Sequence, residues 1–187
     1  MKQLSRFLML LLFMAVAAIW AAGGKLSGRR APGFCLPDVN MKLHDLADYR
    51  GKTVLLEIMQ TNCPHCRDFA KVLKEIKAKY GDQLVVLSVV NPPDTLDSVK
   101  RFIAEMKWTT PMLFDCGQMA ASYMMVTPQN PVMSIPHIFI IDRNGWIQKD
   151  FGYESANKGI FEGQQLFSEL EPFVSDSGSH TKPGRSK

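Results

Sequence analysis

The sequence predicts an α/β fold in which a mixed central β-sheet is flanked by helices, with an N-terminal extension before the folded domain. Nearly continuous apolar runs at 53–59 and 84–90 have the length and composition of buried strands. Each run is followed by a segment whose apolar residues recur every three or four positions, as on one face of a helix. Gly81 is placed to end the first helix, and Asp94 or Thr95 can cap the second.

The other expected elements are short. In chain order they are extended segments at 31–38 and 42–46, a strand at 112–114, a helix-compatible piece at 117–125, a loop at 127–134, strands at 137–142 and 146–151, and a closing helix at 160–173. The last two strands are separated by Arg143-Asn144-Gly145, which is typical of a hairpin. The resulting order of strands and helices is that of a mixed sheet between helices.

Two cysteines, Cys63 and Cys66, stand between the first long strand and the first helix. Pro64 suits the first helical turn, because its missing N–H is not needed there. We expect Thr61 or Asn62 to be the N-cap. Cys63 would then lie at the helix start, where unpaired N–H groups and the positive end of the helix dipole favour a thiolate.

This placement predicts a redox-active dithiol. Only a thiolate attacks a disulfide, so Cys63 is the expected nucleophile and Cys66, one turn further in, the resolving cysteine. His65, when charged, would stabilise the thiolate further. The alternatives are a structural Cys63–Cys66 disulfide or half of a zinc site. The chain has no second Cys-x-x-Cys or His-x-His pair to complete a zinc tetrahedron, so no metal is expected.

The N-terminus has the pattern of an export segment. Lys2 and Arg6 precede an apolar run at 7–22, and further basic residues follow it. The run is an export signal or a single membrane anchor, although it is short for a spanning helix. A buried helix of a soluble domain is the remaining alternative. The first two interpretations place the domain outside the cytoplasm, in the periplasm or its equivalent, anchored in the inner membrane by residues 7–22 if the segment is not cleaved.

The predicted organisation is therefore a signal or anchor with a short linker at 1–30, one domain at 31–174 and a disordered tail at 175–187. A chain of 187 residues with 46% hydrophobic content can bury one good core. The tail contains Ser, Gly, Pro and Lys but almost no apolar residue, a composition that cannot form a core.

The formal net charge of +4 does not describe the domain. Residues 31–174 carry 14 Lys or Arg against 17 Asp or Glu, so the domain is mildly acidic and the positive excess lies in the tails. No basic stripe is interleaved with aromatic residues, and no nucleic-acid partner is expected. Nothing in the chain indicates a nucleotide, flavin or haem site, so no cofactor is expected.

Two further cysteines, Cys35 and Cys116, are far apart in the sequence and have no local partner. In an oxidising compartment they could form a structural disulfide, or Cys116 could relay electrons to the Cys63–Cys66 pair. Isolated buried thiols are the favoured interpretation.

Several motifs in order resemble the thioredoxin superfamily, and between about residues 31 and 173 the chain is similar to TlpA/ResA-like thiol-disulfide oxidoreductases. The matching marks are Ala31-Pro32, Leu36-Pro37-Asp38, Leu46 to Gly51, Cys63-Pro64-His65-Cys66, Ile135-Pro136, Ile141-Asp142 and Gly145. The resemblance implies a thioredoxin-like fold around the central sheet.

The resemblance also implies roles for residues outside the cysteine motif. The proline that matches Pro136 is cis in this family and lies beside the redox pair, where the backbone of the preceding residue, here Ile135, pairs with the substrate chain. Glu57 stands where many thioredoxins carry a buried acid behind the resolving cysteine. Such a carboxyl would have a raised pKa and could exchange a proton with Cys66. The alternative for Glu57 is a strand-end charge that reaches solvent.

The chain departs from the family pattern near the motif. Asn62 replaces the usual Trp, and Met59 and Gln60 replace an aromatic and a small residue. His137 follows the proline where Thr is common, so we hypothesise that His65 and His137 together stabilise the Cys63 thiolate. A His at a strand start that points to solvent is the alternative for His137. The 127–134 loop is longer than usual and could add to a substrate surface.

The expected function is thiol-disulfide exchange with cysteine-containing proteins outside the cytoplasm. The family commonly reduces apocytochrome c or other proteins with electrons from a membrane partner, whereas the Pro64-His65 dipeptide is the one found in strongly oxidising DsbA-type proteins. A thiol peroxidase is a second possibility, but Gln60 occupies the place where that chemistry needs Thr. A copper metallochaperone, using the cysteines, a histidine and nearby methionines, is the third.

Overall fold

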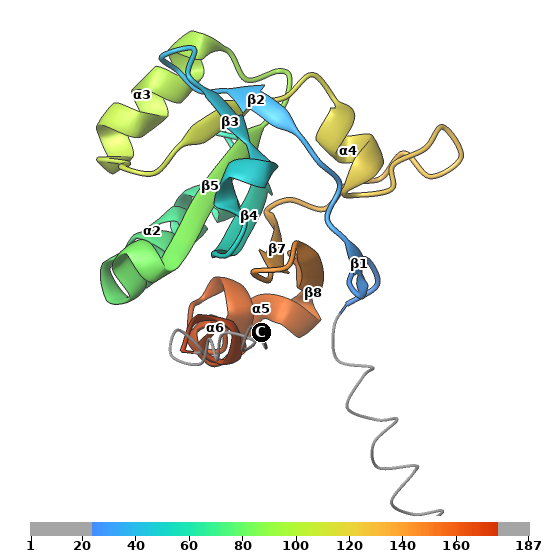
Figure 1. Ribbon diagram of the computed structural model, residues 1–187. Coiled ribbons are helices and arrows are strands. Elements are labelled where there is room, and N and C mark those ends of the chain that lie inside the picture. The colour runs from blue at the N-terminus through green and yellow to red at the C-terminus, as the bar shows by residue number, and fades with distance from the viewer. Residues whose placement is uncertain (1–23, 176–187) are drawn as a thin grey trace, which may run out of the picture.

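The computed structural model describes residues 24–175, which form a six-stranded sheet with helices on its faces and a small two-stranded sheet beside it (Figure 1). The strands of the large sheet are β1 (Arg29–Arg30), β4 (Thr53–Met59), β5 (Leu84–Val90), β6 (Met112–Phe114), β7 (His137–Ile141) and β8 (Trp146–Gly152). Their order across the sheet is β1-β8-β7-β4-β5-β6. Strands β4, β5 and β6 are parallel, and β7 runs antiparallel to β4, so the predicted mixed sheet is confirmed.

The remaining elements surround this sheet. The small sheet pairs β2 (Cys35–Pro37) with β3 (Leu43–Asp45), and the helices are α2 (Pro64–Tyr80), α3 (Leu96–Met106), α4 (Gln118–Ser122), α5 (Lys158–Phe161) and α6 (Leu166–Val174). Short 3-10 turns lie at Leu46–Tyr49, Gly81–Gln83 and Ser155–Asn157. The thioredoxin-like α/β fold expected from the sequence is the fold observed.

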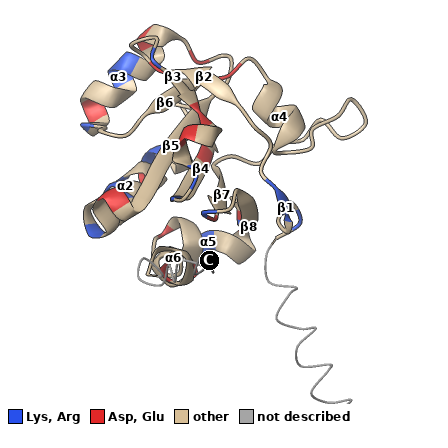
Figure 2. Ribbon diagram, in the orientation of Figure 1, with Lys and Arg blue, Asp and Glu red and all other residues tan. Residues whose placement is uncertain are grey.

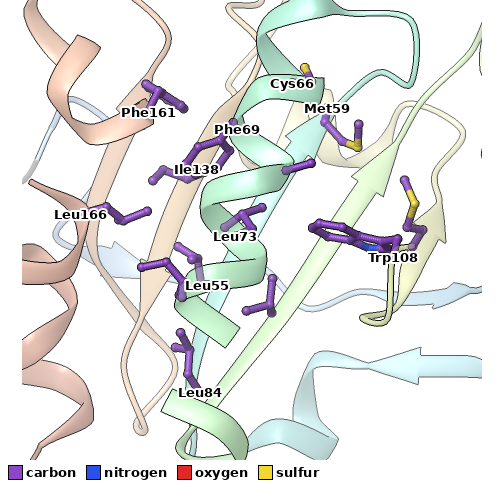
Figure 3. Close-up of a cluster of buried hydrophobic side chains, with 14 of the residues drawn as sticks. Leu55, Met59, Cys66, Phe69, Leu73, Leu84, Trp108, Ile138, Phe161 and Leu166 are labelled. Atoms are coloured by element: carbon purple, nitrogen blue, oxygen red, sulfur yellow. The ribbon is translucent and has the colours of Figure 1, made fainter. Parts of the chain in front are cut away.

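The core is divided between the two faces of the sheet. Because strand side chains alternate, Leu55 and Met59 of β4 face α2, whereas Leu56 and Ile58 face the opposite side. The first cluster includes the apolar sides of α2, α5 and α6 and is drawn in Figure 3. The second is covered by β2, α4 and Tyr123. Residue 57 therefore belongs to the α2 side of the sheet.

Strand β1 extends the sheet into the segment that the sequence assigned to a linker. It pairs antiparallel with β8, and the Leu26 N–H donates to the Asp150 carboxylate at 2.9 Å. The folded domain therefore includes residues before 31. The predicted signal or anchor at 7–22 and residues 176–187 of the predicted tail lie outside the described residues. Within residues 24–175, none of the helices has the length and hydropathy needed to cross a membrane.

The closing helix predicted at 160–173 is wrong in one respect, because the structure divides it into α5 and α6. Gly163 lies between them with a φ of 88°, a conformation that side chains other than glycine's rarely adopt. A Cβ at this position would lie 3.0 Å from Cγ1 of Val72 on α2. The turn therefore depends on both the conformation and the small size of Gly163.

The helix predicted at 117–125 is also shorter than expected. Helix α4 covers only Gln118–Ser122. The chain leaves it through Met125, whose φ is 53°, and the Val126 N–H donates back to the Ala120 carbonyl at 3.0 Å. This bond closes the turn that ends the helical segment before the uncharged loop that follows.

We expect Gly163→Ala to lower the free energy of unfolding by about 2 kcal/mol, because the alanine would be strained at this φ and would press on Val72. Urea unfolding measures the difference. Gly33→Ala is the control, since a Cβ at Gly33 meets nothing within 4 Å, and it should leave the midpoint nearly unchanged. Equal stability of the two variants would contradict the assignment.

Candidate active site

Cys63 is the N-cap of α2. The helix begins at Pro64, and the N–H of Cys66 points back to the Cys63 sulfur at 3.4 Å. The sequence expectation that Thr61 or Asn62 would cap the helix is therefore wrong. The sulfur itself takes the capping position, so it lies directly at the positive end of the helix dipole.

Thr61 does not cap the helix because another element holds it. Its hydroxyl donates to the carboxylate of Asp94, which follows β5, and its N–H donates to the second oxygen of the same carboxylate at 2.9 Å. Asp94 in turn accepts from the Ser98 hydroxyl at 2.8 Å, and Arg67 donates to the Thr61 carbonyl at 3.2 Å. The loop before Cys63 is thus fixed to the start of α3.

The two sulfurs of the motif have different environments. Cys63 is partly exposed, whereas Cys66 is completely buried on the inner side of α2, close to Met59 at one end of the apolar cluster (Figure 3). Burial raises the pKa of the Cys66 thiol, and the charge of Glu57 raises it further. Both cysteines are unbonded in the structure, so the predicted Cys63–Cys66 disulfide stays a prediction.

Glu57 is buried in the centre of β4, on the same side of the sheet as Cys66, and does not reach solvent. One carboxyl oxygen accepts from the Ser88 hydroxyl of β5 at 2.6 Å, and the other has no hydrogen-bond partner among the described residues. Burial raises the pKa of Glu57 to about 7, although the Ser88 bond acts in the opposite direction. The carboxyl can therefore gain or lose a proton near neutral pH.

Ile135 and Pro136 lie at the end of the sheet where β4 leads into the cysteine motif. The bond between them is cis, as the resemblance implied. Ile135 is partly exposed and packs against both apolar clusters, and Cys63 packs against one of them. Within the described part of the chain, the N–H and C=O of Ile135 make no hydrogen bond. They are therefore available to an added chain.

The His137 ring packs on the face of the sheet opposite α2. It stacks on Phe139 at a centroid distance of 4.7 Å, and Phe139 belongs to the apolar cluster on that face. Its Nε2 lies 3.3 Å from an Asp150 oxygen, which is an ion-pair distance without hydrogen-bond geometry. The ring is buried, so the structure supports neither the two-imidazole hypothesis nor a solvent-facing His137.

His65 contacts a residue that the sequence analysis missed. Its exposed ring stacks on Tyr153 at 4.1 Å, and Tyr153 packs edge-on against Phe161. The N–H of Tyr153 also donates to the Pro136 carbonyl at 3.0 Å. Tyr153 thus links the cysteine motif to the proline loop, and an aromatic residue placed directly after the last strand was the signal available for it.

Cys35 and Cys116 are both exposed. The interpretation that they are buried thiols is therefore wrong. Phe34 and Leu36, the neighbours of Cys35, are the buried residues, because strand side chains alternate between core and solvent.

The raised pKa of Glu57 predicts a pH-dependent stability difference in Glu57→Gln. The folded protein holds this proton up to about pH 7, whereas the unfolded chain loses it near pH 4.5, so the wild type loses stability as the pH rises between these values. Relative to pH 4, the variant should gain up to about 3 kcal/mol over the wild type by pH 8. Urea unfolding across this range is the measurement.

The control for this experiment is Glu75→Gln on the exposed side of α2. The difference between this variant and the wild type should not grow between pH 4 and pH 8. If the stability difference for Glu57→Gln is also independent of pH, the pKa of Glu57 is not raised in the folded protein.

Comparison with known proteins agrees with this geometry. The AhpC/TSA family model matches residues 27–150. The chain is 31% identical over 122 residues to thiol-disulfide oxidoreductase ResA of Geobacillus thermodenitrificans (strain NG80-2), covering 65% of this chain and 67% of the relative.

Two solved structures are also similar. A Chlorobium tepidum protein presented as a thiol:disulfide interchange protein DsbE has a TM-score of 0.62 at 30% identity, over 76% of this chain and 96% of the other. The exposed lipoprotein thioredoxin of Streptococcus pneumoniae strain TIGR4 has a TM-score of 0.58 at 28% identity, over 74% and 100%. The chain therefore belongs to the AhpC/TSA family and is a thioredoxin-like enzyme of the thiol-disulfide oxidoreductase class.

Proposed function

We propose that the chain is an extracytoplasmic protein disulfide reductase that acts through Cys63 and Cys66. The observation that carries the proposal is the difference between the two sulfurs, because Cys63 is accessible at the helix start and Cys66 is completely buried one turn later. An accessible sulfur can meet a protein substrate. A buried sulfur next to it can reach only the mixed disulfide that forms there.

The reaction follows from this arrangement. The Cys63 thiolate attacks one sulfur of a substrate disulfide, and the other substrate sulfur leaves as a thiolate that takes up a proton. Cys66 then gives its proton to the Glu57 carboxylate and attacks the Cys63 sulfur, releasing the second substrate thiol. Two electrons have passed to the substrate, and Cys63 and Cys66 are joined in a disulfide. Glu57 is the positioned base for the second step.

The reducing direction is favoured by the similarity to a protein named ResA and to the TlpA/ResA-like oxidoreductases. The Pro64-His65 dipeptide is the feature that favours an oxidant.

The segment that leads to Ile135 suits contact with an extended, uncharged polypeptide. The chain has no charged residue from 116 to 136, and Figure 2 shows α4 and the loop after it without Lys, Arg, Asp or Glu. Val132 in this loop is 75% exposed. The unpaired backbone of Ile135 follows shortly after. We expect an extended substrate segment to hydrogen-bond to the backbone of Ile135 and to pack apolar side chains against the 127–134 loop.

The location outside the cytoplasm is proposed from the N-terminal sequence and from the similarity to an exposed lipoprotein thioredoxin. A reductase there needs electrons supplied by a membrane partner, because exported cysteines otherwise become oxidised. Cysteine-containing exported proteins, such as apocytochrome c, are the proposed substrates.

The test is the reduction potential of the Cys63–Cys66 couple, measured on the full-length chain in glutathione buffers with thiol trapping. We expect a value near that of thioredoxin, about −270 mV. A value near about −120 mV would make the chain a disulfide donor and would overturn the direction. No disulfide between the two cysteines at any glutathione ratio would overturn the proposal itself.

Two single variants test the assignment of roles. Cys66→Ser should accumulate a stable mixed disulfide with a cysteine-containing protein, because the resolving sulfur is missing. Cys63→Ser should form none through Cys66, since Cys66 is buried, and peptide mapping separates such adducts from any at the exposed Cys35 and Cys116. Mass spectrometry of the trapped adducts distinguishes them, and equal trapping by both variants would contradict the roles.

The proton transfer predicts a separate effect in Glu57→Gln. The resolving step should slow about tenfold or more at pH 7, since general base catalysis of this kind contributes at least that much. The measurement is the decay of the mixed disulfide in stopped-flow experiments from pH 6 to pH 9. An unchanged rate and an unchanged pH profile would remove Glu57 from the mechanism.

A further inference from the structure

The β2 strand lies along the free edge of the large sheet. Strand β6 is the last in the sheet order, and beyond it Asp38 forms an antiparallel bridge with Leu113. In an antiparallel pair, each step back along one chain is matched by a step forward along the other. Three residues back from Asp38 is Cys35, and three residues forward from Leu113 is Cys116, so the two cysteines leave this bridge at matching positions.

A second contact keeps the two segments close beyond the cysteines. The Gln118 side-chain amide, at the start of α4, lies 3.5 Å from the Gly33 carbonyl. The Tyr123 hydroxyl donates to the Pro32 carbonyl at 2.7 Å. The chain from residue 32 to 38 therefore stays beside the chain from 113 onward on both sides of the two cysteines.

The packing turns both cysteines outward. Phe34 and Leu36 enter the apolar cluster on the face opposite α2, so Cys35 between them is exposed. Cys116 is exposed after the buried Asp115. The carboxylate of Asp115 accepts the N–H groups of residues 117, 118 and 119, which fixes the turn that carries Cys116.

We propose that Cys35 and Cys116 form a second disulfide, which fastens the β2–β3 sheet to the edge of the large sheet. Opposed residues of an antiparallel pair have Cα atoms about 4.5–5.5 Å apart, within the range that a disulfide spans. The oxidant is a small disulfide such as oxidised glutathione. One protein thiolate displaces a glutathione thiolate, and the other then displaces the second, so two electrons and two protons pass to two glutathione molecules.

This bond is separate from the redox site. Cys116 follows β6 and Cys63 follows β4, and β5 lies between these strands, which are therefore about 10 Å apart across the sheet. A direct relay of electrons from Cys116 to Cys63 would need a large movement of both loops, and Thr61 is held by Asp94. The Cys35–Cys116 disulfide therefore has a structural role. This proposal does not depend on the proposed function.

The test uses the full-length Cys63→Ser/Cys66→Ser variant, in which Cys35 and Cys116 are the remaining cysteines. After equilibration with oxidised glutathione and alkylation with iodoacetamide, peptide mapping should find one peptide pair joined through Cys35 and Cys116. Addition of Cys35→Ser is the control and should leave Cys116 glutathionylated or alkylated. Two separately modified cysteines, or disulfide-linked dimers instead of the internal bond, would overturn the proposal.

A second readout does not depend on mapping. The urea midpoint of the Cys63→Ser/Cys66→Ser chain should be higher when oxidised than after treatment with dithiothreitol, because the bond restricts the unfolded chain. The control with Cys35→Ser should show equal midpoints in both conditions. Equal midpoints in the parent variant, with the internal bond present, would show that the bond does not fasten the β2–β3 sheet.

Discussion

The burial of one carboxyl group in the central strand is the constraint on which the site depends. β4 has β5 on one side and β7 on the other, and α2 covers the face to which Glu57 points. Water cannot solvate the charge there, so the group is held with a pKa of about 7 and a single hydrogen bond from Ser88. The helix that covers Glu57 also brings Cys66 to the same face, and the two groups influence each other's charge.

The positions of the other site residues follow from the strand order. β4 and β5 finish at the same end of the sheet, where β7 begins. Cys63, Asp94 and Ile135 therefore meet at that end from segments far apart in the chain. Contacts between these segments then set the local geometry. Asp94 holds the loop before Cys63, and Tyr153 joins His65 to the proline loop. Packing therefore makes Cys63 accessible and leaves Cys66 buried.

The sequence predicted the main strands and the helix that carries Cys66 well because each has a strong local pattern. It failed where a distant contact decides the outcome. Thr61 has the chemistry of an N-cap, but Asp94 takes its hydrogen bonds. The face on which His137 lies depends on strand pairing, and the division of the last helix depends on the space beside Gly163. Neither is encoded in nearby residues.

The path of residues 24–30 determines which side of the enzyme faces the chain that precedes them. Arg30 lies beside Trp146, and the chain before it runs along β8 to Leu26 beside Asp150, toward the end of β8 that pairs with His137. The polypeptide therefore leaves the domain on the side of the cysteines. Any attachment made through the chain ahead of residue 24 would therefore start from the same side of the domain as Cys63, and would favour substrates and electron donors that approach that side.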